Sequence, residues 1–226
     1  MTDMSVAVLA KRLGVTQRRA NQIVADGLIS ARRTDSGEWL VDVDSAEAFG
    51  RSRRTARGLT PDGAWALLFI LNGQRVDWIS ESTRTRLKRR IRDGSSEVLA
   101  REVAGRTKIR RYRAANLEKA RKNLLLTGRS ATETLFTELL PDQGRLYGYV
   151  PRGTTVDGWA ADNFLVPDTV GNVFLFANTM PAAAAGEKVP ASVVAADLAI
   201  SADARERAAG AVALEEMRAA WLSPIA

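Results

Sequence analysis

The sequence predicts an α+β protein in which a small N-terminal unit precedes a longer mixed α/β region that is rich in helices. Residues 5–27 hold two short segments whose apolar residues recur at helical spacing. Residues 28–43 hold two strand-like runs around a turn-forming stretch. From residue 60 onward, capped helical segments alternate with short strand-like runs, which indicates a folded α/β region.

The first helical segment is predicted to begin at Ser5 and to end at Gly14. Ser5 is a favoured N-cap residue, and Val6, Leu9 and Leu13 recur behind it at helical spacing. Gly14 ends the helix because glycine adopts a positive φ without steric cost.

The second helical segment carries the side chains that indicate nucleic-acid binding. Thr16 caps it, and the pair Asp26-Gly27 ends it. At about 100° per residue, Ala20 and Ile23 face the core, which turns the polar residues outward. Such polar side chains hydrogen-bond to base edges and phosphates. We expect DNA contacts from Thr16, Gln17, Arg18, Arg19, Asn21 and Gln22.

A β-hairpin is predicted directly after the second helix. Residues 28–33 and 38–43 are strand-like, and the turn-forming residues 34–37 join them. Arg32 and Arg33 lie on this hairpin where DNA phosphates would pass, so we expect both to contact DNA.

Residues 1–50 therefore have the order of a winged helix-turn-helix domain, with a further short helix that Asp44 caps and Phe49 ends. This order resembles the DNA-binding domain of excisionase and MerR-like regulators. The simpler alternative is a small helical cap with a solvated basic face, but the caps, turn, hairpin and arginine placement agree with one another. The resemblance rests on Leu9, Leu13, Gly14, Val15, Arg18, Ile23, Gly27, Ile29, Ala31, Arg33, Trp39, Val41 and Phe49.

Residues 51–59 are predicted to be a basic linker, because they interleave arginine with small and polar residues. One alternative is a flexible linker between domains that binds nothing. The other is a basic arm that lies along the DNA backbone or in the minor groove. We favour a linker that becomes ordered on DNA through Arg51, Arg53, Arg54 and Arg57.

Residues 60–122 are predicted to form a basic helical subdomain. Thr60 caps its first helix, and Pro61 occupies the first helical position, where the missing N–H costs nothing. The helix is largely apolar until Asn72-Gly73 ends it, so we expect it to lie in a core.

The second helix of this subdomain, which Ser80 caps, is crowded with cations, and Leu87 and Ile91 are its strong apolar residues. Like charges one turn apart repel each other, so we expect a counter-charge from phosphate or from an acidic protein surface. A solvated surface helix is the alternative. The candidate anion-binding residues are Arg84, Arg86, Lys88, Arg89 and Arg90.

Residues 123–226 are predicted to form an α/β C-terminal interaction domain. We expect its core to bury Trp159, Phe164, Phe174 and Phe176. We expect its last helix to bury Ala208, Val212 and Leu214. From residue 97 onward, helices are predicted at 97–104, 116–123, 130–140, 155–163, from Pro190 and from Asp203, and strands at 107–113, 145–150, 164–166 and 172–178.

The charge is unevenly spread along the chain, whose net charge is +7. Residues 1–122 carry 26 Lys and Arg against 14 Asp and Glu, whereas residues 123–226 carry 7 against 12. A basic first part indicates a nucleic-acid partner. The mildly acidic second part suits a basic protein partner.

The composition excludes several kinds of chemistry. Without cysteine or histidine, the chain cannot form disulfides, Cys/His zinc sites or imidazole acid–base pairs. It also lacks the glycine-rich phosphate motifs, so we expect no enzyme, no catalytic residue, no metal and no cofactor. No apolar run reaches the roughly 20 residues of a membrane span, and no signal-peptide pattern is present, so we expect a cytoplasmic protein.

A second pattern falls on Tyr112-Arg113, on residues 124–131 and 147–150, and above all on residues 193–217. With these segments the chain resembles the AbiEi-type antitoxins of type IV toxin-antitoxin systems. The resemblance implies an antitoxin that represses its own operon and counters a nucleotidyltransferase toxin. In the last segment the family pattern falls on Asp197, Leu198, Ser201, Asp203, Arg205, Ala208, Ala209 and Leu214.

The predicted function is sequence-specific binding of double-stranded DNA, combined with binding of a cognate nucleotidyltransferase-type toxin. The alternative is a free-standing transcriptional regulator, or a phage-type repressor or excisionase, without a toxin partner. A nuclease with a DNA-targeting head would need clustered carboxylates to hold Mg²⁺, and the C-terminal sequence shows no such cluster. We expect no membrane contact, and the oligomeric state stays open.

Overall fold

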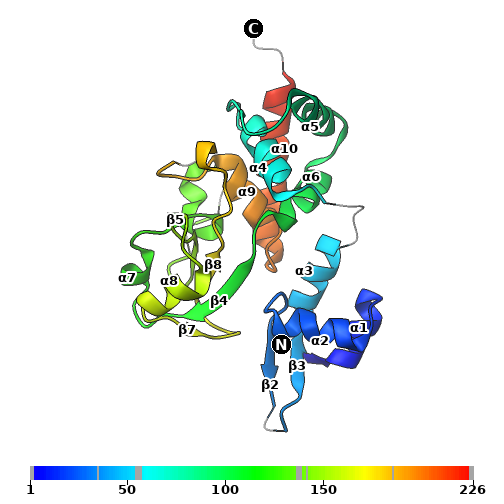
Figure 1. Ribbon diagram of the computed structural model, residues 1–226, viewed down its shortest axis with the longest axis vertical. Coiled ribbons are helices and arrows are strands. Elements are labelled where there is room, and N and C mark those ends of the chain that lie inside the picture. Colours follow the sequence, from blue (N-terminus) through cyan, green and yellow to red (C-terminus); the bar gives the residue numbers. More distant parts are fainter. Residues whose placement is uncertain are drawn as a thin grey trace.

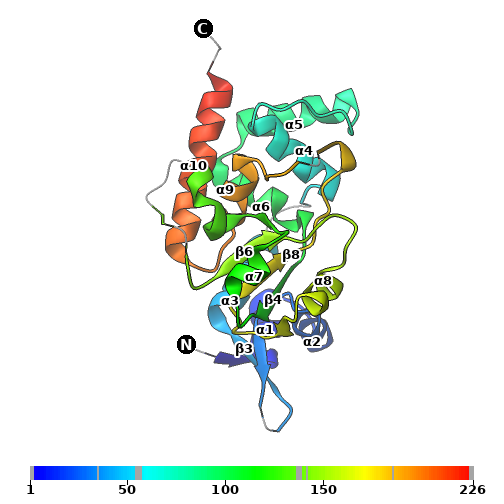
Figure 2. The ribbon, with the colours of Figure 1, turned by 90° about the vertical axis from the view of Figure 1, so that its left-hand side faces the viewer.

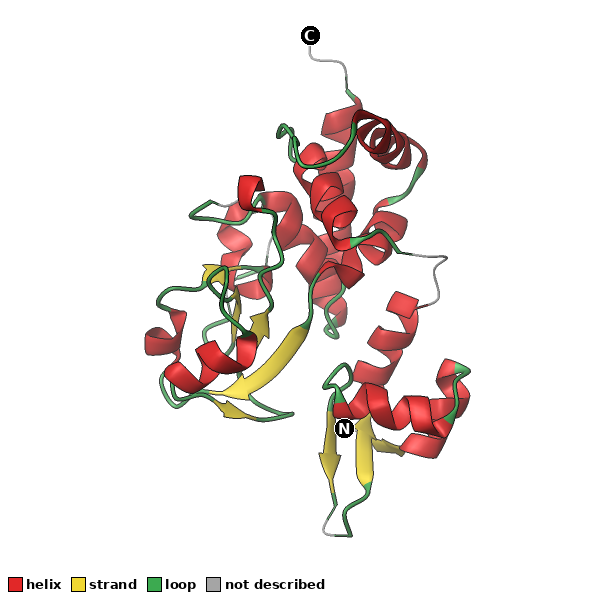
Figure 3. Cartoon of the chain, viewed as in Figure 1, coloured by secondary structure: helices red, strands yellow, loops and turns green. Residues whose placement is uncertain are grey.

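The computed structural model shows a mixed α and β protein with its N-terminal elements at one end of the long axis (Figure 1). At positions 44, 48 and 51–53 it describes the backbone alone. Strands occur in two separate groups, one near the N-terminus and one in the larger part of the molecule (Figure 3). The structure describes residues 3–34, 36–53, 58–135, 139–140, 142–184 and 186–223.

The N-terminal unit contains the two predicted helices and the predicted hairpin. Its antiparallel sheet has the strand order β1-β3-β2, and a small apolar core of its own joins the sheet to the helices. The elements are β1 (Asp3–Ser5), α1 (Val6–Leu13), α2 (Gln17–Ala25), β2 (Ala31–Arg33), β3 (Trp39–Asp42) and α3 (Val43–Arg53).

Local capping explains why these helices begin and end where they do. The side chain of Ser5 accepts a hydrogen bond from the backbone N–H of Val8, and that of Thr16 accepts one from Arg19. Gly14 adopts a φ of 63° at the end of α1, a left-handed conformation that glycine enters freely. The helix boundaries predicted from these residues are confirmed.

The third helix differs from the prediction at both ends. The Asp42 carboxylate accepts a hydrogen bond from the backbone N–H of Ser45 at 2.7 Å, and the side chain of Asp44, the expected cap, lies outside the described residues. The helix therefore begins at Val43 and runs on to Arg53, so the first residues of the expected linker are helical.

The larger part is built around α4 (Pro61–Leu71), in which every residue from Gly63 onward is buried. It packs against α5, α6, η1 and α9 and lies in the main apolar cluster. Figure 2 shows α10 running along one side of this helical group. The helical elements are α5 (Glu81–Asp93), α6 (Ser96–Val103), η1 (Ala104–Arg106), α7 (Leu117–Arg121), η2 (Gly128–Thr134), α8 (Val156–Asp162), η3 (Ala182–Ala184), α9 (Ala191–Ala199) and α10 (Ala204–Leu222).

A five-stranded sheet with the order β5-β6-β8-β4-β7 packs beside the helices. The β6–β8 pair is parallel, and the other pairs are antiparallel. One face carries Tyr149 and Phe176 into the main cluster, while the opposite face packs on α7 and α8. The strands are β4 (Ile109–Arg113), β5 (Leu125–Leu126), β6 (Leu146–Tyr149), β7 (Val166–Pro167) and β8 (Val173–Phe176).

The expected boundary at residue 122 does not separate two cores. Strand β4 lies in the expected helical subdomain, yet it pairs with β7 and β8 from the expected C-terminal domain. Helices α4, α5 and α6 likewise share one apolar cluster with β6, α9 and α10. Residues 58–223 therefore form one packed body within the described chain, because long-range pairing joins segments that look separate locally.

The predicted helix over residues 130–140 is wrong. The Ser130 hydroxyl does not cap a helix but accepts a hydrogen bond from the backbone N–H of Tyr147 at 2.9 Å. The segment forms 3₁₀ turns with a non-helical Ala131, and the backbone is extended by Leu135. Residues 136–138 lie outside the described residues.

Two expectations about burial are also wrong. Phe164 is 80% exposed and has a positive φ of 58°, so it belongs to a turn rather than to a strand. On α10, Ala208 and Val212 point to solvent, and the buried positions are Glu206, Gly210, Ala213 and Leu214. Within the described residues, no helix combines the length and apolar character that crossing a bilayer requires.

Candidate nucleic-acid interface

The outward face of α2 presents polar and cationic side chains to solvent. Gln17, Arg18, Arg19 and Asn21 are exposed, while Ala20 and its apolar neighbours are buried. Arg18 and Arg19 form no ion pair within the described residues, so their donors are free to meet an external acceptor. This part of the predicted interface is brought together on one helical face.

Two of the predicted α2 contacts already have intramolecular partners. The Gln22 side-chain amide donates to the Asp26 carboxylate at 2.7 Å. The Thr16 hydroxyl accepts the capping hydrogen bond described above, at 3.3 Å. Gln22 would exchange one hydrogen bond for another on binding a base, whereas Thr16 contributes first to helix stability.

The hairpin extends beyond α1 and α2, away from the body (Figure 1). Its two arginines have different surroundings. The Arg33 guanidinium lies 4.8 Å from the centre of the Trp39 ring, and Arg32 pairs with Asp3 at 2.8 Å. Arg33 is thus held by a cation–π contact and has no ion pair with any residue that the structure describes, while the charge of Arg32 is partly neutralised.

The remaining predicted DNA contacts follow the hairpin. Arg51 and Arg53 lie on the last turn of α3, for which the backbone alone is described. Arg54 and Arg57 lie outside the described residues.

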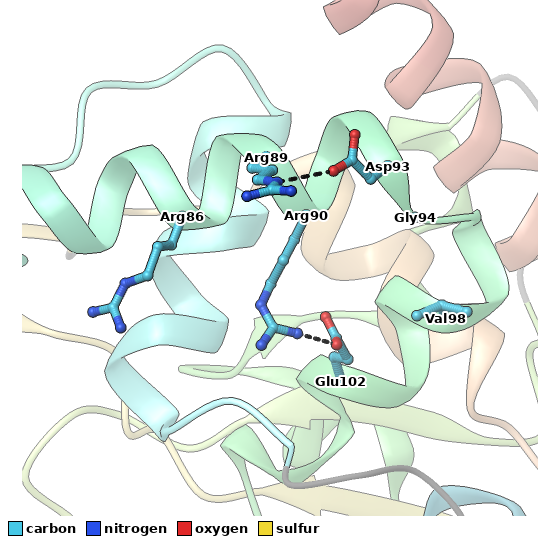
Figure 4. A pocket seen from close by; sticks show the side chains of 7 residues that line it. All are labelled: Arg86, Arg89, Arg90, Asp93, Gly94, Val98 and Glu102. Atoms are coloured by element: carbon cyan, nitrogen blue, oxygen red, sulfur yellow. Dashed lines mark hydrogen bonds and ion pairs between the residues drawn. The ribbon is translucent and has the colours of Figure 1, made fainter.

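The cations of α5 lie at the opposite end of the molecule from the hairpin (Figure 1). We expected these cations to lack a counter-charge within the chain, but three of the five candidate anion-binding residues have carboxylate partners. Arg84 pairs with Glu81. Figure 4 shows the other two pairs, Arg89 with Asp93 at 3.3 Å and Arg90 with Glu102.

Arg86 and Lys88 have no carboxylate partner among the described residues. The Arg86 guanidinium donates to the Thr83 hydroxyl at 3.0 Å on its own helix. An open pocket of about 400 Å³ lies between α5 and α6, and Arg86, Arg89 and Arg90 line it with Asp93, Gly94, Val98 and Glu102 (Figure 4). The structure therefore leaves part of this cationic face available for an anion, but far from α2.

A buried polar cluster was not predicted. Arg106 in η1 and Asp197 in α9 form an ion pair, and neither side chain has exposed surface. The other Asp197 oxygen accepts hydrogen bonds from the hydroxyls of Thr127, at 2.5 Å, and Tyr149, at 2.8 Å. The one local signal is a carboxylate inside the apolar run 193–198.

Burial and charge act against each other in this cluster. Burial raises the pKa of Asp197, and the Arg106 guanidinium and the two hydroxyl donors oppose that rise. Burial lowers the pKa of Arg106, but Asp197 and Tyr149 outweigh it, so the pKa is raised and the guanidinium stays charged. The cluster is fully enclosed, so it holds segments of the body together rather than presenting a reactive group.

A groove of about 720 Å³ lies between the N-terminal unit and the larger part. Its floor includes Tyr147, Phe174 and Arg111, which are cross-strand neighbours on β6, β8 and β4. Gly27, Leu28, Asp42 and Phe49 contribute to the other wall. Sequence reasoning missed this groove, because the three floor residues meet only once the strand order is known.

Among the described residues, no three Asp or Glu side chains gather closely enough to hold a metal ion. The sequence matches no protein-family model, no curated protein and no solved structure in the comparisons made with each.

Proposed function

We propose that the protein is a sequence-specific DNA-binding regulator in which residues 3–53 act as a winged helix-turn-helix domain. The observation that carries the proposal is the outward face of α2, where Arg18 and Arg19 are exposed and unpaired within the described chain. An exposed helix fits into the major groove of DNA, where its hydrogen-bond donors can reach the acceptor atoms on the base edges. The adjoining hairpin offers Arg33 to the phosphate backbone.

The test is a gel shift on the DNA upstream of the protein's own gene. Arg18→Ala should weaken specific binding by about 1–3 kcal/mol and relax the sequence preference, if Arg18 contacts a guanine. Arg75→Ala is the matched control, because Arg75 is also exposed but lies between α4 and α5. Equal binding by the wild type and Arg18→Ala would count against the assignment.

We propose further that the larger part binds a cognate toxin of the nucleotidyltransferase type, so that the protein is a non-enzymatic cytoplasmic antitoxin that represses its own operon. Support comes from the AbiEi-like pattern over residues 193–217 and from the body's separate core.

The antitoxin proposal is tested with the neighbouring gene. If its product inhibits growth and the protein relieves the inhibition, the antitoxin assignment stands. If neither neighbouring product inhibits growth, the alternative of a free-standing regulator, or of a phage-type repressor, is favoured instead.

A further inference from the structure

The groove between the N-terminal unit and the sheet has the dimensions of a small-molecule site. Its volume of about 720 Å³ lies within the range of roughly 300–1,000 Å³ that is common for ligand pockets. One wall comes from the turn after α2 and the start of α3, and the other from the sheet and the α9–α10 connection. A double helix is too wide to enter such a space.

Two arginines, Arg111 and Arg145, line the groove together with the carboxylates of Asp42, Asp203 and Glu206. The Arg111 guanidinium is fixed by hydrogen bonds to the backbone carbonyls of Gly171, at 2.7 Å, and Thr169, at 2.9 Å. Arg145 forms a long ion pair with Asp142, at 3.9 Å, and a hydrogen bond with the Tyr147 side chain raises its pKa. Burial and the positive charge of Arg145 lower the pKa of Arg111, and the negative charges of Asp168 and Asp42 only partly oppose that fall.

The floor beside these arginines is aromatic. The Tyr147 and Phe174 rings stack with their centres 4.5 Å apart and their planes 7° apart. The Arg111 guanidinium lies 4.7 Å from the centre of the Phe174 ring. Leu28 and Phe49 add apolar surface from the N-terminal unit. A site of this kind favours a ligand with both an anionic group and an apolar ring.

We propose that this groove binds a small organic anion with a planar ring, of the mononucleotide class, whose phosphate lies between Arg111 and Arg145. Guanidinium groups bind phosphate by charge-assisted hydrogen bonds, and Arg111 is held in place for that contact by its two carbonyl partners. The ring lies along the apolar wall formed by Leu28 and Phe49. This site is independent of DNA binding by α2.

The experiment is isothermal titration calorimetry of the full chain with AMP, GMP, CMP and UMP, and with inorganic phosphate. At least one mononucleotide should saturate one site per chain. Arg145→Glu should lower its affinity by about tenfold or more, and Arg145→Lys by less, because lysine keeps the charge. The Arg145 side chain is 48% exposed and its ion pair with Asp142 is long, so both variants should still fold.

Two controls separate this site from other surfaces. Arg75→Ala should leave nucleotide binding unchanged, because Arg75 lies outside the groove. Arg18→Ala should also leave it unchanged, whatever its effect on DNA binding. The proposal is overturned if no mononucleotide binds at up to about 1 mM, or if Arg145→Glu binds as tightly as the wild type. If inorganic phosphate binds with the same affinity as the nucleotides, the apolar wall does not contribute to binding and that part of the proposal is wrong.

Discussion

Arg106 and Asp197 form an ion pair in which neither side chain has exposed surface, although 90 residues of chain separate them. Arg106 also donates to the Val103 carbonyl at 3.0 Å and to the Tyr149 hydroxyl at 3.2 Å. Together with Thr127, which precedes η2, these contacts join α6, η1, β6 and α9. Breaking a buried pair of this kind strongly destabilises the folded protein, because removal of one partner leaves the other charge unpaired in a medium that solvates it poorly.

Asp197→Ala should therefore lower the free energy of unfolding by about 3–5 kcal/mol, measured by urea denaturation. Asp77→Ala is the matched control, since Asp77 pairs with Arg75 on the surface and its loss should cost about 1 kcal/mol or less. If the two variants lose the same stability, the buried pair does not hold the body together. The double change Arg106→Met with Asp197→Leu should recover stability, because it removes both charges.

The helices of the N-terminal unit could be predicted from the sequence because each depends on residues close to one another. Ser5 and Thr16 cap through a backbone N–H three positions away, and Ile23 is buried by helical periodicity. The exposed face of α2 follows from the same periodicity. The start of α3 at Val43 was not predicted, because Asp42 and Asp44 are both residues that can cap a helix and the sequence alone does not choose between them.

The body could be predicted less well, because distant pairing decides its conformation. Ser130 has the local signature of a cap, but strand β6 passes close enough for Tyr147 to donate to its hydroxyl. Asp197 and Arg106 meet only in the folded chain. The groove depends on the order of β6, β8 and β4, which local alternation cannot give. No residue spacing in the sequence contains that information.

The protein should lose stability in alkaline solution, because all three tyrosines ionise late. Burial raises the pKa of Tyr112 and of Tyr147 to about 12, and that of Tyr149 well above 10. Unfolded tyrosine releases its proton near pH 10. Between about pH 10 and 12 the folded chain therefore holds more protons than the unfolded chain, so stability falls as the pH rises.

The measurement is the urea midpoint at several pH values between about 9 and 11.5, together with the phenolate absorbance of the folded protein. Tyr112→Phe should reduce the alkaline slope, because it removes one of the three late-titrating groups. Phenolate absorbance that rises near pH 10 in the folded protein would contradict the prediction.

The cationic face of α5 should bind an anionic surface other than the DNA at α2, because the two lie at opposite ends of the molecule (Figure 1). Arg86→Glu with Lys88→Glu should weaken binding of the partner protein, leave promoter binding unchanged and shift the unfolding free energy by less than about 0.5 kcal/mol. Neither residue has a carboxylate partner among those described, and the hydrogen bond that Arg86 donates to Thr83 is exposed, so the loss of stability should be small.

Arg90→Glu is the informative contrast on the same helix. It replaces an ion pair with Glu102 by two like charges, so it should cost stability as well as binding. If the Arg86→Glu, Lys88→Glu double variant binds both the partner and DNA as tightly as the wild type, this helix is only a solvated surface.

The last prediction is that residues 58–226 fold alone and protect against a co-encoded toxin without repressing the promoter. The apolar cluster around Leu9, Ile23 and Val41 belongs wholly to the N-terminal unit, and the body has separate clusters that include Trp65 and Leu175. Because these cores share no member, removal of the first unit should leave the second cooperatively folded.

The fragment lacks α2 and the hairpin, so its affinity for promoter DNA should fall to the nonspecific level. Co-expression with the neighbouring gene's product, with growth and promoter activity scored separately, checks both parts. Protection by residues 1–57 alone, and none by the longer fragment, would reverse the assignment of the two parts.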